Sequence, residues 1–203
     1  MSIRVLHIEL GIHLHGGAEQ VAYLINALEH HDDISLHLVC AEDSEIRHTA
    51  FGHCETHTIK YAGESDFLCV KRLLEVVNGV NPDIIHVHGW LASFLPLYLR
   101  NYYGNEPLFE NSKIVTSVYN QGFDGTLAKN TIDKVRFDAI DDEVITELEE
   151  PSYVNLMKIA VKNSDAVIVG SEDIPKELED FINTLDKPVL KYHNMENFSQ
   201  AYL

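Results

Sequence analysis

The stretch PDIIHVHGWLASFLPLYLR (82–100) begins as a buried strand and changes character within four residues. Its first apolar residues suit a strand covered on both faces, and the apolar spacing of its second half predicts a helix. Between the two lie His86, His88 and Trp90, the only tryptophan of the chain. Polar and aromatic residues where a core strand ends indicate a metal site, a small-molecule site at a sheet edge, or side chains that only pack.

The same order, a short β-rich run followed by a longer helical run, recurs along the chain. Strands are predicted at 3–10, 34–40, 55–61, 83–89, 112–120, 165–171 and 187–194, and helices at 16–31, 66–80, 91–103, 151–164 and 172–185. Strands joined through helices imply right-handed crossovers and a parallel sheet covered on both faces. We therefore predict an α/β fold with a doubly wound, mostly parallel Rossmann-like sheet.

The chain has 203 residues, of which 45% are hydrophobic, and this suits one globular domain with a sizeable core. We predict a single domain over 1–203. Residues 121–150 form its one irregular stretch, an excursion over the sheet edge between a strand and the following helix. The acidic end of that stretch, DAIDDEVITELEE (138–150), is predicted to be a solvated, mobile helical segment.

The charge balance limits the class of partner. The chain carries 32 acidic and 15 basic residues, for a formal net charge of -17. The electrostatic field of a chain with this net negative charge repels nucleic acid, anionic membranes and polyanionic substrates, so we predict neither a nucleic-acid nor a membrane partner. A neutral substrate such as a polysaccharide is not repelled.

Targeting signals and cysteine usage bear on location. The start, MSIRVLHIELG, lacks the apolar stretch and cleavage site of a signal peptide, and no run approaches the roughly 18 apolar residues of a membrane span. The three cysteines are odd in number and have no CxxC spacing, which is typical of reduced thiols. We expect a cytoplasmic protein.

Two glycines mark the first candidate site. In the usual doubly wound order, strand 3–10 lies beside strand 83–89, and ligands bind beyond the carboxyl ends of these two strands. Gly16 and Gly17 follow the first strand, where they allow close backbone approach to a ligand at a helix N-terminus. Glu19 could cap that helix or hold a hydroxyl, although a plain glycine turn is equally consistent. No GxGxxG motif is present, so no dinucleotide cofactor is predicted.

Two H-x-H pairs form the second candidate. His13 with His15, and His86 with His88, could each present both rings on one face of an extended strand. Four imidazoles meeting at the sheet edge would bind zinc and could support a hydrolase. The chain has 12 histidines in all, so coincidence is the stronger interpretation, and we predict no bound metal.

The loop SVYNQGFDGTL (117–127) again places polar residues at the end of an apolar strand. Asn120 and Gln121 can donate and accept hydrogen bonds, and Tyr119 and Phe123 supply flat faces. Carbohydrate hydroxyls are bound by this mixture of amides and aromatic rings. An ordinary β-turn is equally consistent.

Two further residues have a structural interpretation. Trp90 is predicted to pack in the core, with His88 projecting into the crevice, although indole faces also stack on sugars. Ser171 is predicted to cap a helix that begins near Asp173. No G-x-S-x-G elbow surrounds this serine.

Taken in order, these motifs resemble segments of the N-terminal domain of glycogen and starch synthases. The resemblance rests on PDIIHVHGWLASFLPLYL (82–99), SVYNQGFDGTL (117–127) and YVNLMKIAVKNSDAVIVGSEDI (153–174). The stretch GGAEQVAYLINAL (16–28) is similar to the Gly-Gly-x-Glu start of the broader retaining glycosyltransferases of the same two-domain fold.

The resemblance implies roles for individual residues. The family's crevice histidine falls on His88, which we predict to be catalytic, and its acceptor-side asparagine falls on Asn120. The glycines of the donor-contacting loop fall on Gly16 and Gly17. With the residues singled out above, the predicted substrate-binding set is Gly16, Gly17, Glu19, Asn120, Gln121 and Trp90. No cofactor is expected.

Three departures from the family pattern bear on activity. The loop lysine of glycogen synthases falls on Leu14, so the cation that holds donor phosphates is absent. The family's aspartate beside the tryptophan is Gly89. The sequence ends at Leu203, where such enzymes begin a second Rossmann-like domain that carries most of the donor site.

We therefore expect a glycosyltransferase domain of the glycogen or starch synthase type, the acceptor-binding half of a glucosyl transfer from ADP- or UDP-glucose to an α-glucan. Its expected partners are a neutral glucan or sugar, a nucleotide sugar, and a donor-binding partner domain that completes activity. The alternative is a non-catalytic carbohydrate-binding or regulatory module derived from that fold.

Overall fold

The computed structural model describes residues 2–63, 66, 68–104, 106, 109, 111–136 and 140–194. Their strands form one sheet in the order β3-β2-β1-β4-β5-β6-β7, in which every neighbouring pair is parallel. The strands are β1 (Ile3–Glu9), β2 (Ile34–Ala41), β3 (Cys54–Ile59), β4 (Ile84–His88), β5 (Lys113–Val118), β6 (Ala166–Val169) and β7 (Val189–Leu190). The predicted doubly wound sheet is confirmed, and β1 does lie beside β4.

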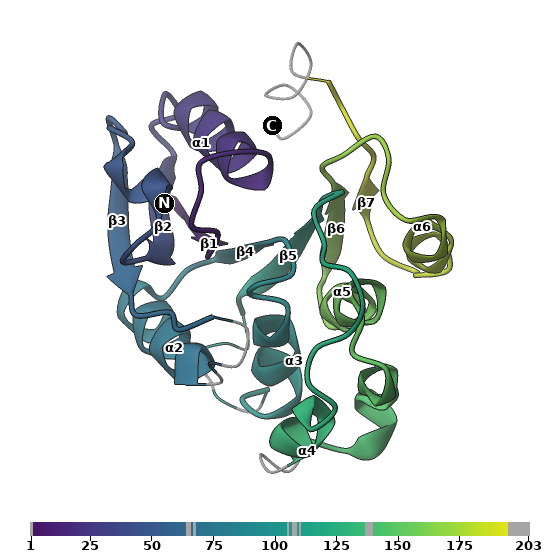
Figure 1. Ribbon diagram of the computed structural model, residues 1–203. Coiled ribbons are helices and arrows are strands. Elements are labelled where there is room, and N and C mark those ends of the chain that lie inside the picture. Colours follow the sequence, from purple (N-terminus) through teal and green to yellow (C-terminus); the bar gives the residue numbers. More distant parts are fainter. Residues whose placement is uncertain are drawn as a thin grey trace.

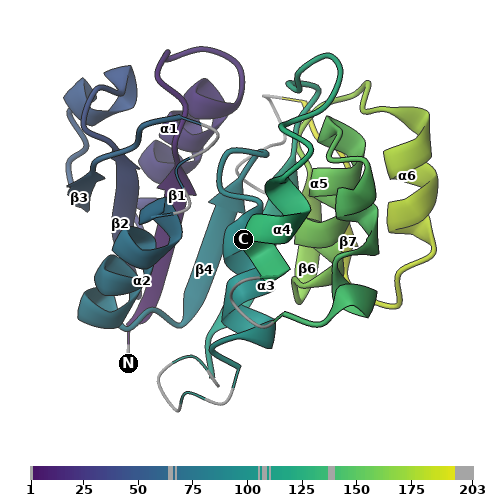
Figure 2. The ribbon, with the colours of Figure 1, turned by 60° about the horizontal axis from the view of Figure 1, so that its bottom comes forward.

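Helices cover the sheet on both faces (Figure 1). They are α1 (Gly17–Leu28), α2 (Leu68–Val80), α3 (Phe94–Asn101), α4 (Thr131–Arg136), α5 (Tyr153–Lys162) and α6 (Lys176–Asn183), with short 3-10 helices η1 (Glu45–His48), η2 (Asp142–Val144) and η3 (Thr146–Glu149). α1 lies on one face, and α2, α3 and α5 lie on the other, which comes forward in Figure 2. Within the described part of the chain, no helix is both long and apolar enough to cross a membrane.

Helix ends follow local backbone chemistry. α2 ends at Val80 because Asn81 adopts a positive φ of 50° and Pro82 cannot continue a helix. α3 begins at Phe94, three residues later than predicted, and it tolerates Pro96 because a first-turn N–H has no partner within the helix.

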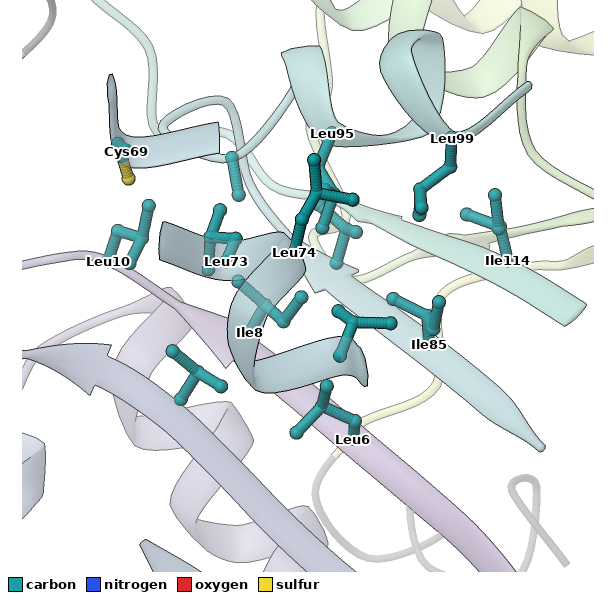
Figure 3. Close-up of a cluster of buried hydrophobic side chains, with 14 of the residues drawn as sticks. Leu6, Ile8, Leu10, Cys69, Leu73, Leu74, Ile85, Leu95, Leu99 and Ile114 are labelled. Carbon is teal, nitrogen blue, oxygen red and sulfur yellow. The ribbon is translucent and has the colours of Figure 1, made fainter. Parts of the chain in front are cut away.

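Successive side chains of each strand point to opposite faces of the sheet, so the core consists of two layers, one on each face. Leu6, Ile8 and Ile85 point toward α2 and α3, where they meet Leu73 and Leu95 in the cluster of Figure 3. The opposite face packs under α1 through Val5, Leu36, Leu38 and Ile25. Complete burial of each such side chain stabilises the fold by about 1.5–3 kcal/mol. Because the β1 positions that face α1 also include His7 and Glu9, the core layer under α1 contains buried polar groups.

The excursion packs on the helical layer and not over the sheet edge. Apolar side chains of the excursion form a cluster with α3 and α5. The prediction that 138–150 is a solvated helix is wrong for the described residues 140–150, which form η2 and η3 and bury Ile140, Ile145 and Leu148. These apolar side chains are interspersed among acidic residues, so the charge run obscured them in the sequence.

The burial of these apolar side chains, which anchors the excursion to the helical layer, can be tested by its effect on the free energy of unfolding. Leu148 is fully buried, so Leu148→Ala should lower the free energy of unfolding by about 2–5 kcal/mol in urea denaturation. Leu68→Ala is the matched control, because Leu68 is 64% exposed and its truncation should cost less than about 0.5 kcal/mol. Equal, small effects of both changes would contradict the anchoring.

Candidate functional site

A hollow of about 350 Å³ opens where β1, β4 and β5 end. It is lined by Glu9, Gly11, Ile12, His13, His15, Gly17, Ala18, His88, Gly89, Trp90, Leu91, Tyr119, Gln121 and Gly122. The volume falls within the range of small-molecule sites, about 300–1,000 Å³. Gly17 and His88 thus border one hollow at the switch point of the sheet, whereas Gly16, predicted to lie there with them, is not among its lining residues.

Gln121 connects the loop after β5 to the N-terminus of α1 at this hollow. Its side-chain Oε1 accepts a hydrogen bond of 2.9 Å from the backbone N–H of Gly17, the first residue of α1. The preceding Gly16 has φ 58°, and a Cβ there would lie 1.5 Å from Gln121 Nε2. Two constraints therefore require glycine at position 16: the positive φ of its backbone and the close approach of the Gln121 amide.

His88 forms part of the wall of the hollow and is only 2% exposed. Its Nδ1 lies 2.8 Å from the hydroxyl of Tyr119, and its Nε2 lies 3.1 Å from Nδ1 of His7. Tyr153 in turn donates a hydrogen bond to the backbone carbonyl of Tyr119. Both ring nitrogens of His88 thus contact protein groups, and the imidazole is held in one orientation.

Sequence reasoning missed His7. In β1 it pairs with His86 of β4, and its ring lies 5.2 Å from that of His86 and 5.4 Å from that of His88, centroid to centroid. His86 Nε2 contacts the Ser117 hydroxyl at 2.7 Å. His7 Nε2 is buried without a hydrogen-bond partner among the described residues. The available signal was the polar His7-x-Glu9 pair alternating with apolar residues in a core strand.

The two H-x-H pairs do not combine into one metal site in the described part of the chain. His13 and His15 are exposed, and His13 Nδ1 lies 3.5 Å from a carboxylate oxygen of Glu45. The pair on β4 instead groups with His7. The four-histidine arrangement considered from the sequence is thus absent here.

Burial sets the protonation states near the hollow. Desolvation lowers the pKa of His7 to about 4 and holds the pKa values of His86 and His88 well below the usual range, so all three rings are neutral at pH 7. Desolvation also raises the pKa of Glu9 to about 7, against the opposing effect of a 2.6 Å hydrogen bond from the Gly11 N–H. A carboxyl that titrates near neutrality therefore lines the hollow.

Three of the predicted substrate-binding residues, Gly16, Glu19 and Asn120, lie outside the lining of the hollow. Asn120 is exposed, and its backbone N–H donates to Ser171 Oγ at 3.0 Å. The prediction that Ser171 caps a helix is therefore wrong, because the serine joins the ends of β5 and β6 and α6 begins only at Lys176. Glu19 is exposed in the first turn of α1.

Trp90 and Leu14 have mainly packing contacts. The Trp90 ring lies 4.6 Å from that of Phe123, centroid to centroid, and joins two core clusters while its edge reaches the hollow. Leu14, at the position of the lysine in the family pattern, packs half-buried against the core under α1. Its backbone N–H donates to Glu45 Oε2 at 2.7 Å. No lysine or arginine is among the described residues that line the hollow.

The parallel sheet with a hollow at its switch point defines a Rossmann-like α/β domain with a ligand-sized site. The family model of the starch synthase catalytic domain matches residues 5–187. The chain belongs to this family, which confirms the resemblance found in the sequence.

Individual relatives agree with this assignment. A glycogen synthase of Geotalea uraniireducens is 32% identical over 98 residues, which are 48% of this chain and 20% of that protein. One from Thermodesulfovibrio yellowstonii is 31% identical over 111 residues, 54% of this chain and 22% of that protein. The matched stretches thus span only about a fifth of each relative.

Solved structures show the same fold at low identity. The catalytic domain of starch synthase IV from Arabidopsis thaliana, bound to ADP and acarbose, superposes with a TM-score of 0.66 at 15% identity, over 96% of this chain and 52% of that chain. Sucrose-phosphate synthase from Thermosynechococcus elongatus superposes with a TM-score of 0.54 at 16% identity, over 94% and 47%.

The contact between Gly16 and Gln121 can be tested by a double-mutant cycle. Gly16→Ala should destabilise the protein by about 1–3 kcal/mol through backbone strain and the clash with the amide. In a Gln121→Ala background the clash is absent, so the same change should cost less by about 1 kcal/mol in urea denaturation. Additive effects would contradict the close approach.

Because the pKa of Glu9 is raised in the folded state, the free energy of unfolding should decrease as the pH rises through the pKa of this carboxyl group. The folded state binds this proton more tightly than the unfolded chain, so the associated stability is present below pH 4.5 and is lost as the pH rises through about 7. A pKa change from 4.5 to about 7 corresponds to about 3 kcal/mol. Glu9→Gln stays uncharged, so its free energy of unfolding should exceed that of the wild type at pH 8–9 by up to about 3 kcal/mol.

At pH 4.5 the Glu9→Gln variant and the wild type should be equally stable. The buried histidines lose stability as the pH falls, but this contribution is the same in both proteins and cancels in the difference. Glu19→Gln, at an exposed position on α1, is the control for the loss of a surface carboxyl group and should change the free energy of unfolding by no more than about 1 kcal/mol. A pH-independent difference for Glu9→Gln would mean that Glu9 ionises normally.

Proposed function

We propose that this chain is the acceptor-binding half of a glucosyltransferase of the glycogen or starch synthase type, with the hollow at the ends of β1, β4 and β5 as its glucan site. The observation that carries this proposal is the joint lining of one hollow by Gly17, His88, Trp90 and Gln121. These residues come from segments that resemble the family's motifs, and they combine polar groups with aromatic faces, as sugar sites do.

The electrostatics favour an uncharged ligand. The lining residues include Glu9, the neutral imidazole of His88 and a side-chain amide, and the chain as a whole has a net charge of -17. Retaining transfer requires stabilisation of charge at the departing phosphate, which cationic side chains usually provide. We infer that glucan binds here and that a donor-binding domain or partner must supply the cations for transfer from ADP- or UDP-glucose.

His88 has a narrower role in this proposal than direct proton transfer. With Tyr119 on one ring nitrogen and His7 on the other, it is a fixed neutral group beside the bound sugar. Tyr119 also lines the hollow, so a sugar hydroxyl bound to the Tyr119 hydroxyl would be linked to His88 through the 2.8 Å contact between that hydroxyl and Nδ1.

A second function, that of a non-catalytic carbohydrate-binding module in the cytoplasm, is favoured by one observation. Leu14 packs against the core where the family places a phosphate-binding lysine, so the chain lacks that donor contact. The two functions share the glucan site and differ in their use of a nucleotide sugar.

Calorimetry separates the two functions. Heat from malto-oligosaccharides alone supports the binding module, and additional heat from ADP-glucose supports a surviving donor site. Gln121→Ala should weaken oligosaccharide binding about threefold to tenfold, the effect of one lost hydrogen bond. Asn130→Ala, an exposed amide outside the lining of the hollow, should leave it unchanged. Equal binding by both variants would place the glucan elsewhere.

Transfer is measured with ADP-glucose labelled in the glucose and glycogen as acceptor. The purified chain alone should incorporate no label above a protein-free blank. Robust incorporation without any partner would contradict the requirement for a separate donor-binding half.

A further inference from the structure

A second cluster of polar side chains lies on the sheet face opposite to the hollow, near the edge strand β3. It consists of His37 on β2 and of Glu55 and His57 on β3. The parallel register pairs His37 with Glu55. Residues two apart on a strand share a face, so Glu55 and His57 both lie beside the His37 ring. None of these residues belongs to the glucan site proposed above, and the inference does not depend on that function.

The three side chains approach at the distances of metal ligands. His37 Nδ1 lies 3.3 Å from His57 Nε2 and 3.5 Å from Glu55 Oε2, and His57 Nε2 lies 3.9 Å from Glu55 Oε1. Two ligands bound tetrahedrally to zinc at about 2.0–2.1 Å are about 3.3–3.4 Å apart. The contacts to the carboxylate are longer than ordinary hydrogen bonds, so shared protons account for them poorly.

The orientation of His37 favours the same assignment. Its Nε2 faces Ser35 Oγ at 3.4 Å, so Nδ1 is the ring nitrogen directed toward the other two groups. Polar groups beside the outer ring nitrogen are usual at metal-binding imidazoles. Burial also lowers the pKa of His37, which keeps the ring neutral, as a metal ligand must be.

We propose that His37, Glu55 and His57 bind a zinc-class divalent cation. Two imidazoles and a carboxylate are a common ligand set for zinc with one open position. The cluster lines an open cavity of about 870 Å³, which gives the ion an entry path and a place for a water or another fourth ligand. The side chains of His37 and His57 are 13% and 23% exposed, so the site is accessible. The bound ion would tie the edge strand β3 to β2.

The test uses the full chain without a histidine tag, stripped of metal and titrated with ZnCl₂ in a calorimeter. We expect one zinc ion per chain, and replacement by Co²⁺ should give visible absorption bands of a four-coordinate ion. His57→Gln and the isosteric Glu55→Gln should each weaken zinc binding at least tenfold. Zinc should raise the melting temperature of the wild type and not that of either variant.

His53→Gln is the matched control, because His53 is an exposed histidine immediately before β3 that is not part of the cluster. It should bind zinc as the wild type does. Circular dichroism establishes that each variant is folded, and Glu55, whose side chain is 67% exposed, can change to Gln without disturbing the core. Absence of zinc uptake, uptake that survives His57→Gln and Glu55→Gln, or equal weakening by His53→Gln would each overturn the proposal.

Discussion

The parallel pairing of β1 with β4 is the constraint on which the rest of the structure depends. It joins Val5 to Ile84 and continues to Ile8 beside Val87, so the two strands end at the same edge. The loops that follow them therefore start side by side, and the hollow forms between those loops. A shift of one residue in this register would turn the polar side chains toward α2 and α3 and place leucines and isoleucines on the α1 face.

The same pairing explains how polar groups are tolerated in the core. His7 meets His86 across the strand pair, and desolvation keeps the buried rings neutral. The contacts that run from His7 through His88 to Tyr119 engage three of the ring nitrogens, and His86 Nε2 contacts the Ser117 hydroxyl. The unpartnered Nε2 of His7 costs about 1–3 kcal/mol. Retention of such a group beside a ligand-sized hollow is consistent with a role in orienting His88.

The two candidate sites lie on opposite faces of the sheet. The hollow at the strand ends uses the α1 face, where family motifs converge, and the neutral His88 imidazole and the Gln121 amide suit the proposed uncharged sugar. The cluster of His37, Glu55 and His57 uses the opposite face at the β3 edge, where a partly exposed carboxylate and two imidazoles suit a cation. Each site thus matches its proposed ligand in charge, and the two sites share no residue.

Strand periodicity and winding order are local or general rules, so they suffice to predict the alternation of strands and helices, the parallel sheet, and the meeting of Gly17 and His88 at one hollow. The partners of these residues depend on long-range packing. Gln121 reaches Gly17 across 104 positions and His7 reaches His88 across 81, and no pattern within either segment encodes such a contact. Likewise Ser171, Leu148 and His37 depend on neighbours that only packing supplies, since side-chain contact is a property of the folded surface and not of sequence spacing.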